Sequence, residues 1–324
     1  MKIKVLILGG TLFTGRILTE RLLQRSDILL TLFNRGKSNR DTFANVPQLH
    51  GNRETDDINL VLQQNWDVVI DFSGYYPLTF ANLLNKWSGK VGRYIFISTI
   101  SVFPIQELGG MVHEADTILA CTEAQKASAL PDAYGEKKAE MERLLQAHSS
   151  LDSIILRPSF IYGRFDWTDR FYYWLYRAAK QQRVLAPEFK LLSLTYAEDL
   201  ARGIENAITV SKHRQVYNAI THRHVSLAET MQQTATHYNK PVQWISATND
   251  VLEKNVTNPS PFPLALPFNL EVEGNSWLTD LSVVPTPYEQ SVKATIAYAE
   301  SIGWPVPKAG LSTEEETKII HLLQ

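Results

Sequence analysis

The first half of the chain alternates short, continuously apolar runs with segments of helical periodicity. Residues 5–8 form the first apolar run, and residues 16–25 follow it with Ile17, Leu18, Leu22 and Leu23 on one helical stripe. Further apolar runs lie at residues 28–33, 68–72, 94–98 and 153–156. Strands that are apolar on both faces are typical of a parallel sheet that helices cover on both sides. The alternation therefore predicts βαβ units and an α/β fold with a doubly wound parallel sheet.

The composition excludes several classes of protein. Among the 324 residues, 44% are hydrophobic and 20% are charged, which excludes a disordered chain. The 32 Lys and Arg residues nearly balance the 34 Asp and Glu residues, so there is no overall positive field to bind nucleic acid. A single cysteine, Cys121, excludes an internal disulfide framework and a cysteine-rich zinc site. Because no apolar run approaches about 20 residues and no signal-peptide pattern is present, we expect a soluble cytoplasmic protein without a membrane partner.

Three glycines lie at the first predicted strand–helix junction, in the run GGTLFTG. A phosphate can approach backbone N–H groups only where no side chain blocks the turn, and the helix N-terminus adds partial positive charge. An ordinary turn that uses glycine for its positive φ would have the same spacing. The flanking strand and helix favour a dinucleotide site. Its predicted contacts in this turn are Gly9, Gly10, Thr11, Leu12, Phe13 and Gly15.

The end of the second predicted strand bears on which dinucleotide binds. Dinucleotide folds usually carry Asp or Glu about 20 residues after the last glycine, where the carboxylate binds the ribose 2′-hydroxyl. In this chain that position is Arg35, with Asn34 before it and Lys37 after it, and no carboxylate ends the strand. A guanidinium suits a 2′-phosphate, although a solvated basic loop would have the same composition. We therefore favour NADP, with NAD as the alternative, and expect Asn34 and Arg35 to contact it.

A tyrosine and a lysine lie four residues apart in the run YGEKK. Tyr134 and Lys138 would share one face of a helix. A nearby ammonium favours the phenolate and moves a phenol pKa of about 10 toward neutral pH, where acid–base catalysis needs it. Such pairs are common by chance. Here, however, Thr99 and Ser101 follow an apolar run and place hydroxyls at the carboxyl edge of the sheet, where doubly wound folds bind ligands.

Taken in order, these motifs resemble one family. The chain is similar over nearly its whole length to the extended short-chain dehydrogenase/reductases, the NAD-dependent epimerase/dehydratase group. The resemblance rests on GGTLFTG at residues 9–15, ISTISVF around Thr99, YGEKK at 134–138, LRPSFIYG at 156–163 and LTYAEDLA at 194–201. Within the family the chain looks most like a bacterial branch that is similar to the chloroplast stem-loop RNA-binding proteins.

The resemblance implies a cofactor site at the matching positions. The glycines of the first turn would line the pyrophosphate, although the family's middle glycine is Leu12 here. Asn52, in HGNR, stands where the family has an Asp that meets the adenine ring. The other implied contacts are Asn34 and Arg35 at the adenosine ribose, and Lys138 at the nicotinamide ribose. Ser73 and Gly74 would also contact the cofactor, directly after the apolar run at residues 68–72, which corresponds to the family's fourth strand.

The resemblance also implies a mechanism. Thr99 stands at the family's catalytic Ser or Thr position, Tyr134 is the acid–base group, and Lys138 lowers the pKa of the tyrosine. Sugar 4,6-dehydratases of the family use an Asp and a Glu directly after the catalytic Thr, but Ile100 and Ser101 occupy these positions here, which argues against dehydration. What remains is an oxidoreductase or epimerase that transfers a hydride at a carbonyl or secondary alcohol of a sugar-like or otherwise hydroxylated small substrate.

The second half predicts the substrate pocket. The aromatic and basic run at residues 164–180 favours a pocket and helix over a platform for stacking nucleic-acid bases. Within it, Arg170 would bind a substrate phosphate or carboxylate, or form a structural ion pair; Tyr75 and Ser101 are the other candidate substrate contacts. The run HEAD at residues 113–116 has no second cluster at ligand spacing, so no metal site is predicted.

We expect two domains. Residues 1–162, with 195–220 returning to them, would form an NAD(P)-binding Rossmann domain, and residues 163–194 and 221–324 a smaller, discontinuous α/β substrate-binding domain. Ser312 and Glu315 predict a capping box at the start of a C-terminal helix. Family members often pair through two helices per subunit, so the resemblance is compatible with a homodimer.

One alternative belongs to a different class of function. An RNA-binding or cofactor-sensing regulatory protein would share the fold, and the resemblance to the stem-loop-binding branch motivates it. The near-neutral charge balance and the complete set of Thr99, Tyr134 and Lys138 favour the enzyme.

Overall fold

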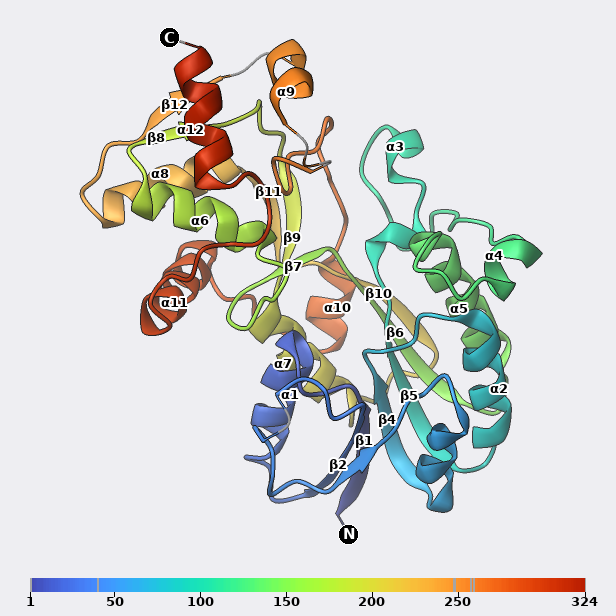
Figure 1. Cartoon of the computed structure of the whole chain (residues 1–324). Coiled ribbons are helices and arrows are strands. Elements are labelled where there is room, and N and C mark those ends of the chain that lie inside the picture. The colour runs from blue at the N-terminus through green and yellow to red at the C-terminus, as the bar shows by residue number, and fades with distance from the viewer. Residues whose placement is uncertain (1, 40, 247–248, 257, 259, 324) are drawn as a thin grey trace. The chain divides into compact units, whose positions relative to one another are not determined.

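The computed structural model describes residues 2–39, 41–246, 249–256, 258 and 260–323, and its largest element is a seven-stranded sheet. All its paired strands are parallel. In chain order they are β1 (Ile3–Leu8), β2 (Ile28–Asn34), β3 (Gln48–His50), β4 (Trp66–Asp71), β5 (Val91–Ile97), β6 (Asp152–Pro158) and β10 (Gln215–Ala219). Across the sheet the order is β10-β6-β5-β4-β1-β2-β3, so the chain winds outward in both directions from β1 (Figure 1). The doubly wound parallel sheet is confirmed.

The sheet brings several strand ends to one edge. Leu8, the last residue of β1, lies opposite Phe33 on β2 and Asp71 on β4. The order of strands reverses between β1 and β4, and doubly wound folds bind ligands at the carboxyl edge of such a reversal. The loops after these strands are therefore the expected place for a site.

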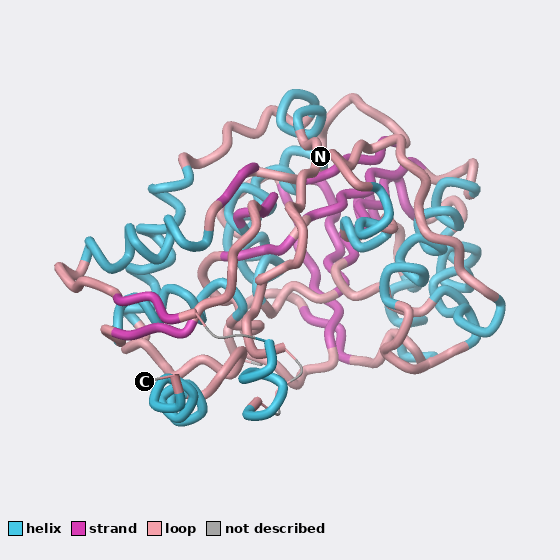
Figure 2. Tube along the Cα trace, turned by 90° about the horizontal axis from the view of Figure 1, so that it is seen from above, coloured by secondary structure: helices cyan, strands magenta, loops and turns pink. Residues whose placement is uncertain are grey.

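Helices cover both faces of the sheet (Figure 2). On one face α1 (Phe13–Leu22) packs against α7 (Ala197–Ala207), and on the other α2 (Pro77–Trp87) packs against α5 (Tyr134–Ala147). The second contact belongs to an extensive apolar core, with Phe80 and Trp87 of α2 and Met141 of α5 fully buried against the strands. Burying a large apolar side chain contributes about 1.5–3 kcal/mol, so this layer holds α5 firmly on the sheet.

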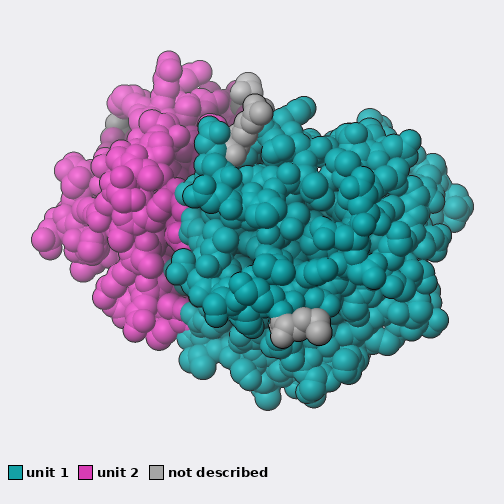
Figure 3. Space-filling model, turned by 90° about the horizontal axis from the view of Figure 1, so that it is seen from below, with its two compact units in different colours: residues 1–160, 195–221, 272–285 teal, residues 161–194, 222–271, 286–324 magenta. Residues whose placement is uncertain are grey.

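The chain divides into two compact units (Figure 3). The first comprises residues 1–160, 195–221 and 272–285, and the second comprises residues 161–194, 222–271 and 286–324. The expected division differs in one segment, because it groups residues 272–285 with the second domain. The first unit also contains the short elements η1 (Asp56–Gln63), η2 (Ile100–Val102), α3 (Ile105–Leu108), α4 (Glu123–Ala127) and α10 (Asn275–Asp280).

The helix α10 explains why this late segment joins the first unit. Trp277 on α10 is fully buried, and its indole Nε1 donates a hydrogen bond to the carbonyl oxygen of Ile220, 2.9 Å away. A Cβ added at Gly203 of α7 would lie 2.5 Å from this indole. The segment is thus held by one large side chain that fits a glycine on a helix some 70 residues earlier in the chain, and no local pattern indicates such a contact.

The second unit combines small sheets and helices. Its strands are β7 (Phe160–Tyr162), β8 (Arg183–Leu185), β9 (Leu192–Tyr196), β11 (His222–Val225) and β12 (Gln243–Ile245), with β7 and β9 crossing the unit boundary. They form the sheets β11-β9-β7 and β12-β8. Its helices are α6 (Arg170–Lys180), α8 (Leu227–His237), α9 (Asn249–Asn255), α11 (Tyr288–Ser301) and α12 (Thr313–Leu322).

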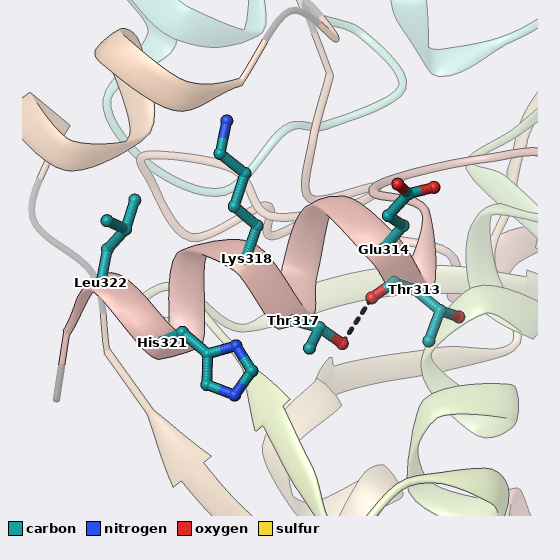
Figure 4. A pocket seen from close by; sticks show the side chains of 6 residues that line it. All are labelled: Thr313, Glu314, Thr317, Lys318, His321 and Leu322. Carbon is teal, nitrogen blue, oxygen red and sulfur yellow. Dashed lines mark hydrogen bonds between the residues drawn. The ribbon is translucent and has the colours of Figure 1, made fainter.

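The C-terminal helix α12 begins as predicted. The Ser312 hydroxyl accepts from the backbone N–H of Glu315, and the Glu315 carboxylate accepts from the N–H of Ser312, so the capping box is confirmed. A buried ion pair between Arg177 and Glu316, 2.6 Å long, joins α12 to α6. The outer face of α12 lines a shallow hollow that contains none of the predicted site residues (Figure 4).

No helix among the described residues is long and apolar enough to cross a membrane.

Replacing Gly203 by alanine tests how α10 is held. Alanine is the better helix former by about 1 kcal/mol, but its methyl group would overlap the Trp277 indole. We expect Gly203→Ala to lower the free energy of unfolding by about 1–3 kcal/mol, measured by urea denaturation followed by circular dichroism. Gly110→Ala is the control, because open space surrounds a Cβ there. A Gly203→Ala variant as stable as the parent would contradict this packing.

Candidate active site

The glycine turn between β1 and α1 presents bare backbone. Gly9 and Gly10 have φ of +108° and +88°, which side-chain-bearing residues rarely adopt. A Cβ at Gly15 would lie 2.9 Å from the nitrogen of Gly10, so only glycine lets the helix approach the turn this closely. The Thr19 hydroxyl is within hydrogen-bond distance of the carbonyl oxygens of Gly10 and Gly15, both at 2.9 Å, and ties the helix to the turn.

The residues between the glycines differ in burial and in backbone conformation. Leu12 has an extended backbone with φ of −126°, and its side chain is 42% exposed. Leu12, at the position of the family's middle glycine, therefore does not need a left-handed backbone. The next residue, Phe13, does have a positive φ, of +43°. Phe13 and Thr11 are both buried. The turn fits a pyrophosphate, because the first-turn N–H groups of α1 lack partners within the helix and the glycines carry no side chain of their own.

The end of β2 lies beside this turn. The N–H of Gly9 donates to the carbonyl oxygen of Phe33, and the Asn39 amide donates to that of Thr11. The Asn34 side chain is engaged locally, with its Nδ2 donating to Gln48 Oε1 at 2.9 Å and its Oδ1 accepting from the N–H of Gly36 at 2.8 Å. The Asn34 side chain therefore joins the loop after β2 to the start of β3.

Arg35 differs from its neighbour. Its side chain is exposed, and within the described part of the chain it forms no hydrogen bond or ion pair. A guanidinium in this position is available to an anionic group bound beside the glycine turn.

The loop after β3 contains a residue that the sequence analysis missed. The Asn52 side chain is exposed and accepts from the N–H of Glu54, closing its own loop. The next residue, Arg53, has a side chain only 8% exposed. Its Nη1 donates to Asp71 Oδ1 at 2.6 Å and to Ser73 Oγ at 3.0 Å. Arg53 thus joins the loop after β3 to the end of β4 and the segment that follows it.

Asp71, the last residue of β4, is the centre of this network. It is fully buried and accepts hydrogen bonds from the Tyr94 hydroxyl at 2.6 Å and from the N–H of Ser73 at 2.8 Å. Burial alone would raise the pKa of Asp71, but the Arg53 guanidinium outweighs it and holds that pKa below its usual value. A Cβ at Gly74 would lie 3.1 Å from Asp71 Oδ2, so glycine lets the chain pass close to this carboxylate.

The hydroxyl loop after β5 meets the start of α5. The Thr99 hydroxyl caps η2 by accepting from the N–H of Ser101 at 3.1 Å, and it donates to Ser101 Oγ at 3.2 Å. Thr99 is buried and Ser101 is exposed. A Cβ at Gly135 would lie 2.1 Å from the carbonyl oxygen of Ser101, so the first turn of α5 packs directly on this loop. The glycine in YGEKK therefore lets the start of α5, where Tyr134 lies, approach the loop of Thr99 and Ser101.

Lys138 is buried beneath this loop. Its side chain is 2% exposed, and its Nζ donates to the carbonyl oxygen of Ile97, the last residue of β5, at 2.8 Å. The ammonium lies 4.5 Å from the ring centroid of Phe96 and 5.2 Å from that of Tyr75. Burial lowers the pKa of Lys138 to about 8, against a partial opposing effect of Asp71.

Two phenols stand at the open side of the site. Tyr134 is 43% exposed, and its ring centroid lies 6.3 Å from that of the exposed Tyr75. Burial of the Tyr75 hydroxyl, helped by the charge of Asp71, raises the pKa of Tyr75. The structure thus gathers Thr99, Tyr134 and Lys138 at the carboxyl end of β5, with Tyr75 beside them. Their catalytic roles remain predictions.

A second buried ion pair anchors α5, and sequence reasoning missed it too. Glu142 is fully buried and accepts from the Ser98 hydroxyl and from Arg157, whose Nη2 lies 2.6 Å from Glu142 Oε2. Glu142 follows Tyr134 and Lys138 at intervals of four residues, and this spacing was the available signal. The pair joins α5 to the ends of β5 and β6.

Two other groups were considered from the sequence, Arg170 and His113. Arg170 belongs to the second unit, where its Nε donates to the Thr168 hydroxyl at 3.2 Å, and its role toward a substrate stays a prediction. His113 lies 2.8 Å from the Glu273 carboxylate. The described residues contain no cluster of three or more His, Cys, Asp or Glu side chains that could hold a metal ion.

Comparisons with known proteins agree with this architecture. The sequence profile of the NAD dependent epimerase/dehydratase family matches residues 5–219. Among solved structures, UDP-glucuronic acid 4-epimerase from Bacillus cereus in complex with NAD is 18% identical, with a TM-score of 0.70 over 94% of this chain and 100% of that one. The dTDP-glucose 4,6-dehydratase from Bacillus anthracis in complex with NAD is 14% identical, with a TM-score of 0.70 over 92% and 97%. The Bordetella bronchiseptica enzyme WbmH in complex with NAD⁺ is 17% identical, with a TM-score of 0.70 over 94% and 100%.

At these identities the likeness to solved structures shows the fold. No curated protein sequence matches the chain. The expected likeness to the chloroplast stem-loop RNA-binding proteins finds no support in these comparisons.

The anchor of α5 can be tested by a double-mutant cycle. Arg157→Met would leave the Glu142 carboxylate buried without its cation, and we expect it to cost about 3–5 kcal/mol of unfolding free energy in urea denaturation. Adding Glu142→Met should recover more than half of this loss. Arg143→Met, at a partly exposed pair on the same helix, should cost less than about 1 kcal/mol. Equal losses at Arg157 and Arg143 would contradict the assigned anchor.

Proposed function

The chain belongs to the NAD dependent epimerase/dehydratase family, and from this premise we propose that it is an NAD(P)-dependent oxidoreductase or epimerase. Its substrate would be a sugar-like or otherwise hydroxylated small molecule that reacts at a carbonyl or secondary alcohol. The first unit would bind the cofactor and the second would contribute to the substrate pocket. The enzyme would act in the cytoplasm, and a homodimer is compatible with the family.

One observation carries the proposal. Thr99, Tyr134 and the buried ammonium of Lys138 lie at the carboxyl end of β5, in the same sheet edge as a turn that fits a pyrophosphate. A tyrosine with a lysine one helical turn away suits proton transfer at neutral pH, because the ammonium stabilises the phenolate. A pyrophosphate site at one end and an acid–base pair at the other suit a dinucleotide between them.

The proposed mechanism assigns each residue a task. A bound nicotinamide would supply or accept the hydride. In the reducing direction Tyr134 donates its phenolic proton to the substrate carbonyl oxygen, and Thr99 hydrogen-bonds the same oxygen and positions it. Lys138 remains protonated and stabilises the tyrosinate that forms. In the oxidising direction Tyr134 takes the proton from the substrate hydroxyl.

The residues after Thr99 bear on the type of reaction. Ile100 is buried and apolar, and Ser101 is an exposed hydroxyl, so neither position supplies a carboxylate. Dehydration needs an additional acid and base at the substrate, whereas epimerisation needs only oxidation, rotation of the keto intermediate and reduction. We therefore favour epimerisation or simple carbonyl reduction, with Tyr75, Ser101 and Arg170 as candidate substrate contacts.

The exposed guanidinium of Arg35 supports NADP as the cofactor. A 2′-phosphate would gain a charge-assisted hydrogen bond from it, and a 2′-hydroxyl would gain nothing specific. The neighbouring structures named above contain NAD, which makes NAD the alternative.

Replacing Tyr134 by phenylalanine tests the mechanism. The variant lacks the transferable proton, so we expect turnover to fall about 10²–10⁴-fold while NADPH binding is retained. Turnover is followed by NMR of sugar nucleotides, with UDP-glucuronic acid and UDP-glucose as the first probes. Tyr76→Phe removes a hydroxyl from a nearby tyrosine outside the proposed machinery and serves as the control. Full activity of Tyr134→Phe on a verified substrate would refute the mechanism.

Replacing Arg35 by alanine tests the cofactor. We expect the parent protein to bind NADPH more tightly than NADH in calorimetric titrations, and Arg35→Ala to weaken NADPH about tenfold without changing NADH. The control is Arg25→Ala, which removes an arginine paired with Asp27. It makes the same change in net charge but should leave the dissociation constants of NADPH and NADH unchanged. Tighter binding of NADH by the parent protein would refute the choice of NADP.

A further inference from the structure

The ion pair between Arg53 and Asp71 has no task in the mechanism above, although it lies at the same edge of the sheet. Both side chains are buried, and their closest atoms, Nη1 and Oδ1, are 2.6 Å apart. Buried ion pairs add little net stability compared with apolar residues of the same size, because both charges must leave water. The position of the pair, at the carboxyl end of β4, therefore suggests a role in the site.

Asp71 is a fixed negative charge. Three groups donate hydrogen bonds to its carboxylate at 2.8 Å or less: Arg53 Nη1, the N–H of Ser73 and the hydroxyl of Tyr94. Donors that bind the ionised form keep a carboxyl deprotonated. Burial would raise the pKa of Asp71, but these donors, led by Arg53, lower it below its ordinary value. The carboxylate is thus ionised at neutral pH.

Gly74 and the ring of Phe96 connect the surroundings of Lys138 with those of this carboxylate. An ideal Cβ at Gly74 would meet Asp71 Oδ2 at 3.1 Å and the ring of Phe96 at 2.9 Å. The Lys138 ammonium lies 4.5 Å from the centroid of that same ring. Asp71 therefore lies next to Gly74, Gly74 lies next to Phe96, and Phe96 lies next to the ammonium. Coulomb interactions act over such distances in a buried site, because water does not screen them.

The surroundings of Lys138 make its proton sensitive to charge. Burial lowers the pKa of Lys138 to about 8; Asp71 opposes this shift, Arg53 reinforces it, and Glu142 opposes it to a smaller extent. These charges come from β4, the loop after β3 and α5 itself. The titratable phenols that face the ammonium are Tyr75 and, one helical turn away, Tyr134. Asp71 and Arg53 therefore act on Lys138 with opposite signs.

We propose that the ion pair between Arg53 and Asp71 sets the charge of Lys138 and, through it, the upper pH limit of the site. The two residues are positioning residues, because they act through Lys138 and not on a substrate. The inference rests on the proposed function for the use that is made of Lys138. The charge of Lys138 itself is a property of the protein alone.

Single replacements of the pair should move the Lys138 pKa in opposite directions. Asp71→Asn keeps the size of the side chain but removes its negative charge, so Lys138 should lose its proton at lower pH. Arg53→Gln removes the positive charge, so Lys138 should keep its proton to higher pH. Arg53→Lys keeps the charge and should stay close to the parent protein. A purely structural pair would not produce shifts of opposite sign.

The measurement is a pH titration of the full-length protein labelled with ¹³C at the ε-carbon of lysine. Comparison with Lys138→Arg identifies the Lys138 resonance by its absence. We expect Asp71→Asn to lower, and Arg53→Gln to raise, the proton affinity of Lys138 by about threefold or more, which is about half a pH unit each. Shifts below this size, or shifts of the same sign, would overturn the proposal.

Two further results keep the test decisive. If Asp71→Asn does not fold, the double variant Arg53→Gln/Asp71→Asn takes its place, and its Lys138 titration should lie below that of Arg53→Gln alone. A double variant that titrates with or above Arg53→Gln would overturn the proposal. The proposed function is judged separately by titrations of the parent protein with NADPH and with NADH. Binding of neither would refute the proposed function and would leave the Lys138 shifts unchanged.

Discussion

The attachment of α5 to the carboxyl ends of β5 and β6 is the constraint on which the site depends. Glu142, fully buried, accepts hydrogen bonds from Ser98 at the end of β5 and from Arg157 at the end of β6. Gly135 lets the first turn of the same helix touch the carbonyl oxygen of Ser101. With the helix held at both points, Lys138 between them is forced into the sheet edge, and Tyr134 is left at the open side.

One face of α5 therefore carries both the buried anchor, Glu142, and the proposed acid–base group, Tyr134. Tyr134, Lys138 and Glu142 follow one another at intervals of four residues, so they share that face. Burial decreases along it, from the enclosed carboxylate to the exposed phenol. The ion pair of Arg53 with Asp71 places opposite charges near the same lysine. The site is thus organised around a buried ammonium whose proton depends on the charges near it.

The sequence predicted the parts of this arrangement that depend on near neighbours in the chain. Continuously apolar runs predicted the parallel sheet, and glycine spacing predicted the open turn after β1. The four-residue spacing predicted that Tyr134 and Lys138 share a face. It did not predict that the Asn34 side chain binds Gln48 on β3, that the Asn52 side chain binds within its own loop, or that Trp277 fits against Gly203. These contacts depend on the conformation of a loop or on segments far apart in the chain.

The sequence by itself determined the class of fold and the place of the glycine turn, because periodicity and glycine conformation are local properties. It also supplied the prediction that Thr99, Tyr134 and Lys138 form the catalytic set. Only the tertiary structure decided that Lys138 is buried and which charges act on it. Arg53 and Asp71 are eighteen residues apart and become partners only because β3 and β4 end at the same edge of the sheet. An ion pair between such segments leaves no periodic signal, since its partners are chosen by the order of the strands.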